Sequence, residues 1–213
     1  MGYTHYYKQR TSVLSTKWAS FKTKLSQAFD HLPDYSSSAG RVGGPSGPRL
    51  VIADGMGENV LSSADMLFTP NQFFSEDGTK LRGESVWFNG LKSKEGDWSH
   101  ETFWLTRLTQ GDDAGSWFTK TARKPYDWLV CAALILINHE SPGSFDISSD
   151  GEVDDWVPVI EWLAEVLDEP LRLPKDIDPS QRVYGPTGRI NVAAVPPEQS
   201  WEASISGEQS FYF

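Results

Sequence analysis

One early segment of the chain repeats apolar residues at three- and four-residue intervals. Side chains with this spacing share one face of an α-helix, and proline does not continue a helix. The pattern therefore predicts an amphipathic helix that ends before Pro33. Its apolar stripe consists of Leu14, Trp18, Phe21, Leu25, Ala28 and Leu32.

Other segments alternate apolar and polar residues, which is typical of half-buried β-strands. Glu84–Leu91 and Glu101–Leu108 have this pattern on either side of a glycine-containing turn, so they predict an antiparallel hairpin. Further strands are expected at Gly2–Gln9, at Leu50–Ala53 and at Trp117–Thr121.

Two later segments predict helices with different surroundings. Tyr126–Asn138 is apolar on nearly every side, which indicates a central helix buried beneath the sheet. The next segment has a single apolar stripe and ends before Pro170. This stripe consists of Val153, Trp156, Ile160, Leu163 and Leu167.

The order of these elements predicts the α+β class, with a mainly antiparallel sheet packed against about three helices in one domain, residues 1–168. Residues 169–213 contain six of the thirteen prolines and no helical period, so they predict an irregular C-terminal arm with a strand at Arg189–Val195. Phe211, Tyr212 and Phe213 are too apolar for a solvated tail. The arm is therefore expected to dock on the core or on a second subunit of a homo-oligomer.

Composition narrows the function classes. The 213 residues carry 19 Lys and Arg against 29 Asp and Glu, a net charge of −10, which argues against a protein that binds duplex DNA along its length. The longest apolar run, Leu129–Ile137, is about half of the roughly 20 residues needed to cross a bilayer, so no membrane partner is expected. Cys131 is the only cysteine and lies inside that run, which predicts a reducing compartment, by default the cytosol.

A cluster of cations precedes the predicted central helix. The first N–H groups of a helix lack intrahelical partners, and the helix dipole is positive at that end. The cluster is therefore a candidate binding site for a phosphate or a carboxylate. Arg123 could bind such an anion with two hydrogen bonds. In the structural alternative, the cations pair with the acidic run at 146–168, and Thr121 or Asp127 caps the helix. The candidate ligand-binding residues are Lys120, Thr121, Arg123, Lys124, Tyr126 and Asp127.

Aromatic side chains crowd the first predicted strand. Alternation places Tyr3, His5 and Tyr7 on one face and Thr4 and Tyr6 on the other. Tyr3, His5 or Tyr6 could stack on a nucleobase or hydrogen-bond its edge. The structural alternative is that these rings pack in the core or on the sheet surface.

Two polar turns add candidates. Asn89, between Phe88 and Gly90, could select the edge of a ligand, although an Asn-Gly pair also ends a strand in a turn. Asp150 could bind a base edge or a ribose. The acidic residues at 148–155 would suit Ca²⁺ or Mg²⁺, but their spacing departs from the EF-hand and helix capping is sufficient for them, so no metal is expected. We also expect no cofactor, because no recognisable cofactor or nucleophile motif is present.

Several short motifs occur together and resemble a family of small uncharacterised proteins of bacteria and their phages. This resemblance spans residues 1–167 and implies a common fold and the same loops, without an established activity. The phage occurrence suggests, by analogy, sequestration of a nucleotide signal used in host defence. The motifs are Gly2-Tyr3-Thr4-His5-Tyr6, Phe88-Asn89-Gly90, His100-Glu101-Thr102-Phe103, Lys120-Thr121-Ala122-Arg123-Lys124-Pro125-Tyr126-Asp127 and Ser149-Asp150-Gly151.

Together these features predict a non-enzymatic binding protein for a small anionic ligand derived from a nucleotide. In this hypothesis Lys120, Arg123 and Lys124 neutralise phosphates. One alternative is a hydrolase or transferase acting on such a ligand, with His5 or Asp150 as general acid or base. Another is a protein-interaction or inhibitor module that uses the C-terminal arm.

Overall fold

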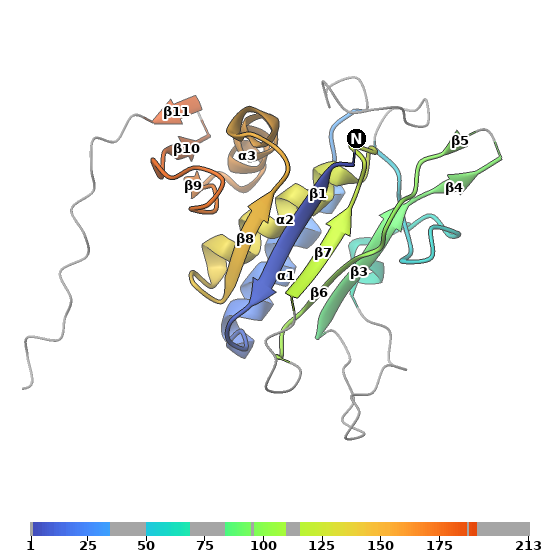
Figure 1. The fold of residues 1–213 in the computed structure, drawn as a ribbon, viewed down its shortest axis with the longest axis horizontal. Coiled ribbons are helices and arrows are strands. Elements are labelled where there is room, and N and C mark those ends of the chain that lie inside the picture. The colour runs from blue at the N-terminus through green and yellow to red at the C-terminus, as the bar shows by residue number, and fades with distance from the viewer. Residues whose placement is uncertain are drawn as a thin grey trace, which may run out of the picture.

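The computed structural model describes residues 2–34, 50–68, 84–94, 96–109, 116–186 and 188–190. Over these residues, α-helices and antiparallel strands form one α+β domain, which confirms the predicted fold class (Figure 1). The elements are β1 (Thr4–Gln9), α1 (Ser15–Asp30), β2 (Ile52–Ala53), the 3₁₀ helix η2 (Ala64–Leu67), β3 (Ser85–Gly90), β4 (Lys92–Ser93), β5 (Gly96–Asp97), β6 (Phe103–Thr106), β7 (Ser116–Lys120), α2 (Asp127–Glu140), β8 (Phe145–Ser149), α3 (Val153–Leu167), β9 (Leu171–Arg172), β10 (Val183–Gly185) and β11 (Gly188–Ile190).

A three-stranded sheet with the order β7–β1–β8 positions the candidate site, and both outer strands run antiparallel to β1. Its register places Tyr6 between Phe118 on β7 and Ser148 on β8. The predicted alternation of the first strand is confirmed, because His5 and Tyr7 are buried whereas Tyr6 is exposed. Strand β8 lies in a segment for which the sequence pattern predicted no element.

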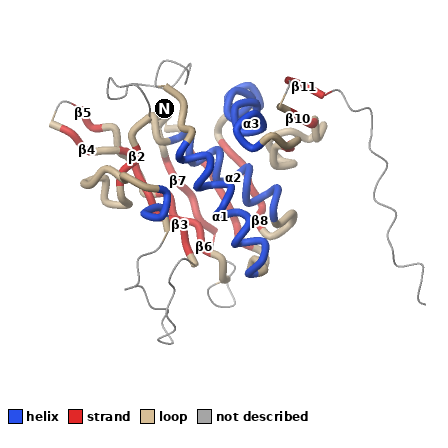
Figure 2. Tube along the Cα trace, turned by 180° about the vertical axis from the view of Figure 1, so that it is seen from behind, coloured by secondary structure: helices blue, strands red, loops and turns tan. Residues whose placement is uncertain are grey.

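A second sheet, β2–β3–β6, contains the predicted hairpin. Strands β3 and β6 pair antiparallel, with Phe88 opposite Phe103. Strand β6 lies beside β7 in both views of the molecule (Figures 1 and 2). The rings of Trp104 and Trp117 lie 5.5 Å apart at this junction, and Tyr7 Oη donates a hydrogen bond of 3.1 Å to the Trp104 carbonyl. The two sheets therefore share one core.

Helices α1 and α2 cover one face of the β7–β1–β8 sheet and leave the opposite face open (Figures 1 and 2). Every residue from Trp128 to Ile137 is buried, which confirms the predicted central helix. Helix α1 buries most of the predicted stripe through Trp18, Phe21 and Leu25, whereas Leu14 precedes the first turn and is exposed. No helix within the described ranges is long and apolar enough to cross a membrane.

The segment after α3 forms a small antiparallel sheet, β11–β10–β9. Leu171, Leu173 and Tyr184 from this segment are buried in the main core, so it packs on the domain. The strand expected at Arg189–Val195 begins as β11, and residues 191–213, with their terminal aromatic cluster, lie outside the described residues.

Candidate functional site

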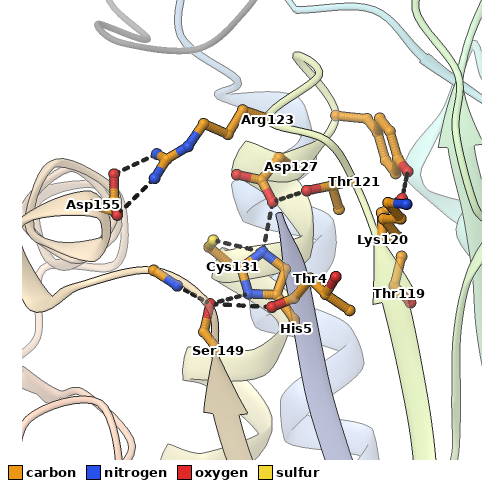
Figure 3. Close-up of polar contacts among 12 residues, drawn as sticks. Thr4, His5, Thr119, Lys120, Thr121, Arg123, Asp127, Cys131, Ser149 and Asp155 are labelled. Atoms are coloured by element: carbon orange, nitrogen blue, oxygen red, sulfur yellow. Dashed lines mark hydrogen bonds and ion pairs between the residues drawn. The ribbon is translucent and has the colours of Figure 1, made fainter. Parts of the chain in front are cut away.

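A buried polar network surrounds His5 on the central strand of the sheet (Figure 3). The His5 Nε2 atom lies 2.6 Å from Asp127 Oδ1 on α2, and both side chains are fully buried. On the other side of the ring, Nδ1 lies 3.0 Å from Ser149 Oγ at the end of β8. The imidazole therefore joins a hydroxyl to a carboxylate across three elements of the fold.

Two further side chains complete this network. Thr121 Oγ1 donates a hydrogen bond of 2.7 Å to Asp127 Oδ1. Cys131 lies one helical turn after Asp127, with its Sγ 3.7 Å from His5 Nε2. Burying these polar groups is costly unless each finds a partner, and here they bond to one another across β1, β8, α2 and the loop before α2. Their arrangement thus links secondary-structure elements that are distant in the sequence.

Arg123 lies at the edge of this network in a strained loop. Ala122 and Arg123 have φ angles of 51° and 57°, which non-glycine residues rarely adopt. The Arg123 guanidinium donates to both carboxylate oxygens of Asp155 (Figure 3). It also lies 3.9 Å from the centre of the Tyr3 ring. Hydrogen bonding to Asp155 raises the pKa of Arg123. The cation therefore has an internal counter-ion, as in the structural alternative derived from the sequence.

Asp155 has a second role at the start of α3. Its carboxylate accepts a hydrogen bond of 3.0 Å from the Glu152 N–H, and the Glu152 side chain in turn accepts from the Asp155 N–H, which forms a capping box. The acidic residues at this position thus cap the helix and neutralise Arg123.

The remaining residues of the basic loop make internal contacts. Lys124 Nζ donates to the Asp97 carbonyl, and Tyr126 Oη donates a hydrogen bond of 2.7 Å to the Glu101 carbonyl. Tyr126 is buried, and desolvation raises its pKa. The N–H groups of Lys124 and Asp127 donate to the carbonyls of Thr121 and Lys124. This turn therefore differs from the open anion seat that its cations suggested.

Asn89 is buried at the end of β3. Its Nδ2 donates to the His100 carbonyl at 3.1 Å, and its Oδ1 accepts from the N–H groups of Gly90 and His100. The amide thus ties the end of β3 to the backbone of His100. In this arrangement its hydrogen-bonding groups face the protein.

The open face of the β7–β1–β8 sheet carries a different set of residues. Tyr6 and Phe118 are direct cross-strand partners and are 43% and 59% exposed. Lys8 lies two residues after Tyr6, and Lys120 lies two residues after Phe118, so both lysines lie on the same face as the rings. Tyr6 Oη donates a hydrogen bond of 3.3 Å to Asp150. We call these five residues, Tyr6, Lys8, Phe118, Lys120 and Asp150, the open-face cluster.

Only some of the candidate residues on β1 and around it can be reached from the open face. Tyr3 and His5 are buried, so the stacking face expected from their strand is turned into the protein. Tyr6, Lys120 and Asp150 remain at the surface. Phe118 was missed by the sequence analysis, although alternation within Trp117–Thr121 already placed it on the same face as Lys120.

Among the described residues, two groups of side chains have donor atoms suited to a metal ion. His5, Asp127 and Cys131 offer N, O and S donors within 4.8 Å of one another, as do the N and O donors of His139, Glu140 and Glu169. In the first group, His5 and Asp127 already bond directly at 2.6 Å. In the second, the Lys24 ammonium lies 2.5 Å from each glutamate and supplies the positive charge.

Comparison with protein-family models, with curated proteins and with solved structures gives no match. Function is therefore inferred from the buried network and the open-face cluster.

Proposed function

We propose that this chain binds a small nucleotide-like anion on the open-face cluster. The observation that carries the proposal is the cross-strand pair of exposed rings, Tyr6 and Phe118, on a sheet whose other face is covered by helices. An exposed aromatic side chain leaves apolar surface in water, whereas a base stacked on it removes that surface.

The charges around the rings support an anionic ligand. Lys8 and Lys120 flank Tyr6 and Phe118, and neither lysine forms an ion pair with a described residue. Their ammonium groups would neutralise phosphates. Asp150, which already accepts a hydrogen bond from Tyr6, would accept one from a ribose hydroxyl or a base amino group.

Arg123 has a positioning role in this proposal. Its bidentate bond to Asp155 and its contact with the Tyr3 ring hold the loop between β7 and α2 in place. In bacteria or their phages, a protein of this kind would sequester a nucleotide signal, in keeping with the analogy drawn from the sequence resemblance.

Calorimetric titration with AMP, ATP and cyclic di-AMP tests the proposal. Removing one stacking ring in Tyr6→Ala or Phe118→Ala should weaken a bound nucleotide by about 1–3 kcal/mol, or roughly 5- to 150-fold. Leu14→Ala removes another exposed apolar side chain, which lies before α1 and outside the open-face cluster, and serves as the control. Lys17→Gln is the corresponding control for Lys120→Gln.

The outcomes are distinct. Binding that is weakened by this amount in both aromatic variants and kept in both controls supports the proposal. Absence of binding for all three nucleotides, or equal affinity in the aromatic variants, contradicts it. Binding of a single-stranded oligonucleotide without any mononucleotide binding would assign the surface to single-stranded nucleic acid instead.

A second candidate function is hydrolysis or group transfer, and one specific observation favours it. The order Ser149 Oγ, His5, Asp127 is that of a hydroxyl, a base and an orienting carboxylate, with contacts of 3.0 and 2.6 Å. Ser149 is only half-buried. If this arrangement is catalytic, nucleotides incubated with the protein will be converted to products that chromatography separates, and Ser149→Ala will abolish the conversion. Ligand recovered unchanged supports the binding function.

A further inference from the structure

A separate pocket of about 640 Å³ lies where the end of α2, strand β8 and the segment 170–183 meet. This volume is within the range of about 300–1,000 Å³ that is typical of small-molecule sites. None of the residues of the open-face cluster or of the buried network lines it. The pocket is therefore a candidate site independent of the proposed nucleotide surface.

One side of the pocket is apolar and rigid. Phe145 and Ile147 of β8 are buried side chains that line it together with Val183 of β10. Pro170 and Pro174 form part of its wall, and proline restricts the backbone to few conformations. Rigid walls reduce the entropy lost when a ligand binds. Such a surface suits the flat apolar body of a small molecule.

The rim of the pocket is positively charged. Arg172 on β9 and Lys175 in the following turn are exposed, and the salt bridges within the described ranges include neither of them. Of the two lining carboxylates, Asp146 is paired with Arg10, which leaves Asp176 as the opposing charge. An excess of positive charge is notable in a chain with a net charge of −10.

His139 adds a polar group without adding charge at neutral pH. Burial, with a smaller contribution from Lys24, lowers its pKa. The neutral imidazole offers one donor and one acceptor nitrogen. The pocket thus combines an apolar floor, two cations and a neutral hydrogen-bonding group.

We propose that this pocket binds a small organic anion with an apolar ring, of the aromatic carboxylate class. The ring lies against Phe145, Ile147 and Val183, and the carboxylate bonds to Arg172 and Lys175. A guanidinium matches the two oxygens of a carboxylate with parallel hydrogen bonds, which gives Arg172 the larger part in recognition.

An NMR titration of the full chain with 2-naphthoate tests this site. The methyl signals of Ile147 and Val183 report on the floor of the pocket and should shift saturably. 2-Naphthamide has the same ring system and no charge, so its affinity should be at least about tenfold lower.

Paired charge variants identify the residues responsible. Arg172→Gln with Lys175→Gln removes two exposed charges from the rim, so the fold should be retained, and 2-naphthoate should bind at least about tenfold more weakly. Lys17→Gln with Lys94→Gln removes the same charge from two other exposed positions and should leave the affinity unchanged. The proposal is overturned if the methyl shifts do not saturate, if the amide binds equally well, or if the rim variant binds like wild type.

Discussion

Replacing Asp127 with alanine should destabilise the protein more than any surface substitution of a carboxylate. The Asp127 Oδ1 atom contacts His5 Nε2 at 2.6 Å and accepts from Thr121 Oγ1 at 2.7 Å, and all three side chains are fully buried. In the variant, His5 and Thr121 would both lose this acceptor. Water cannot take its place, because both side chains are fully buried. A buried polar group that loses its partner costs about 1–3 kcal/mol. Removing one partner of a buried pair such as His5–Asp127 costs about 3–5 kcal/mol.

Urea unfolding followed by far-UV circular dichroism measures this loss at neutral pH. The free energy of unfolding should fall by about 3–5 kcal/mol with an unchanged m-value, because the surface exposed on unfolding is the same. Asp127→Asn keeps an acceptor oxygen and should cost less. Asp146→Ala is the matched control, since its ion pair with Arg10 lies on the surface, and it should leave the midpoint nearly unchanged.

Two results would refute this account of the network. An Asp127→Ala variant within about 1 kcal/mol of wild type would mean that the two contacts contribute little to stability. An Asp146→Ala variant as unstable as Asp127→Ala would mean that burial is not the cause.

Three further predictions follow from other contacts. Gly151→Ala should lower the free energy of unfolding by about 1–3 kcal/mol in urea titrations, because a Cβ there overlaps the Tyr3 phenol; an unchanged midpoint would contradict this contact. Burial lowers the pKa of His139, so the unfolded chain takes up the proton more readily, and stability should fall as the pH drops below about 6.5; His139→Gln should reduce that slope. Leu173→Ala should cost about 2–5 kcal/mol, and truncation after Asp168 should sharply lower the melting temperature, because both remove buried contacts of the segment after α3; a truncated protein with an unchanged melting temperature would show that this segment is dispensable.

The elements with strong periodicity could be predicted from the sequence. The stripe of Trp18, Phe21 and Leu25, the alternation around Phe88 and Phe103, and the apolar central helix all correspond to observed elements. Strand β8 could not be predicted, because its Asp146, Ser148 and Ser149 resemble a polar turn. Its strand conformation depends on pairing with β1, which lies some 140 residues away in the chain.

The candidate site was only partly predictable for a related reason. Tyr3, His5, Arg123 and Asp127 were each candidate ligand-binding residues in the sequence, and in the structure they contact one another. It did not indicate which of them reach the surface. That Arg123 is neutralised by Asp155 depends on how α3 packs beside the loop, a contact between positions 32 residues apart.

Local periodicity by itself determined the helices, the hairpin and the two faces of β1, because each depends on residues a few positions apart. The tertiary structure alone decided that His5 faces a carboxylate and a hydroxyl, that Phe118 joins Tyr6 on an open surface, and that β8, β9 and β10 enclose a pocket with the end of α2. These outcomes depend on which elements pack together. Pairing and packing are long-range interactions, so a pattern read along one segment does not contain them.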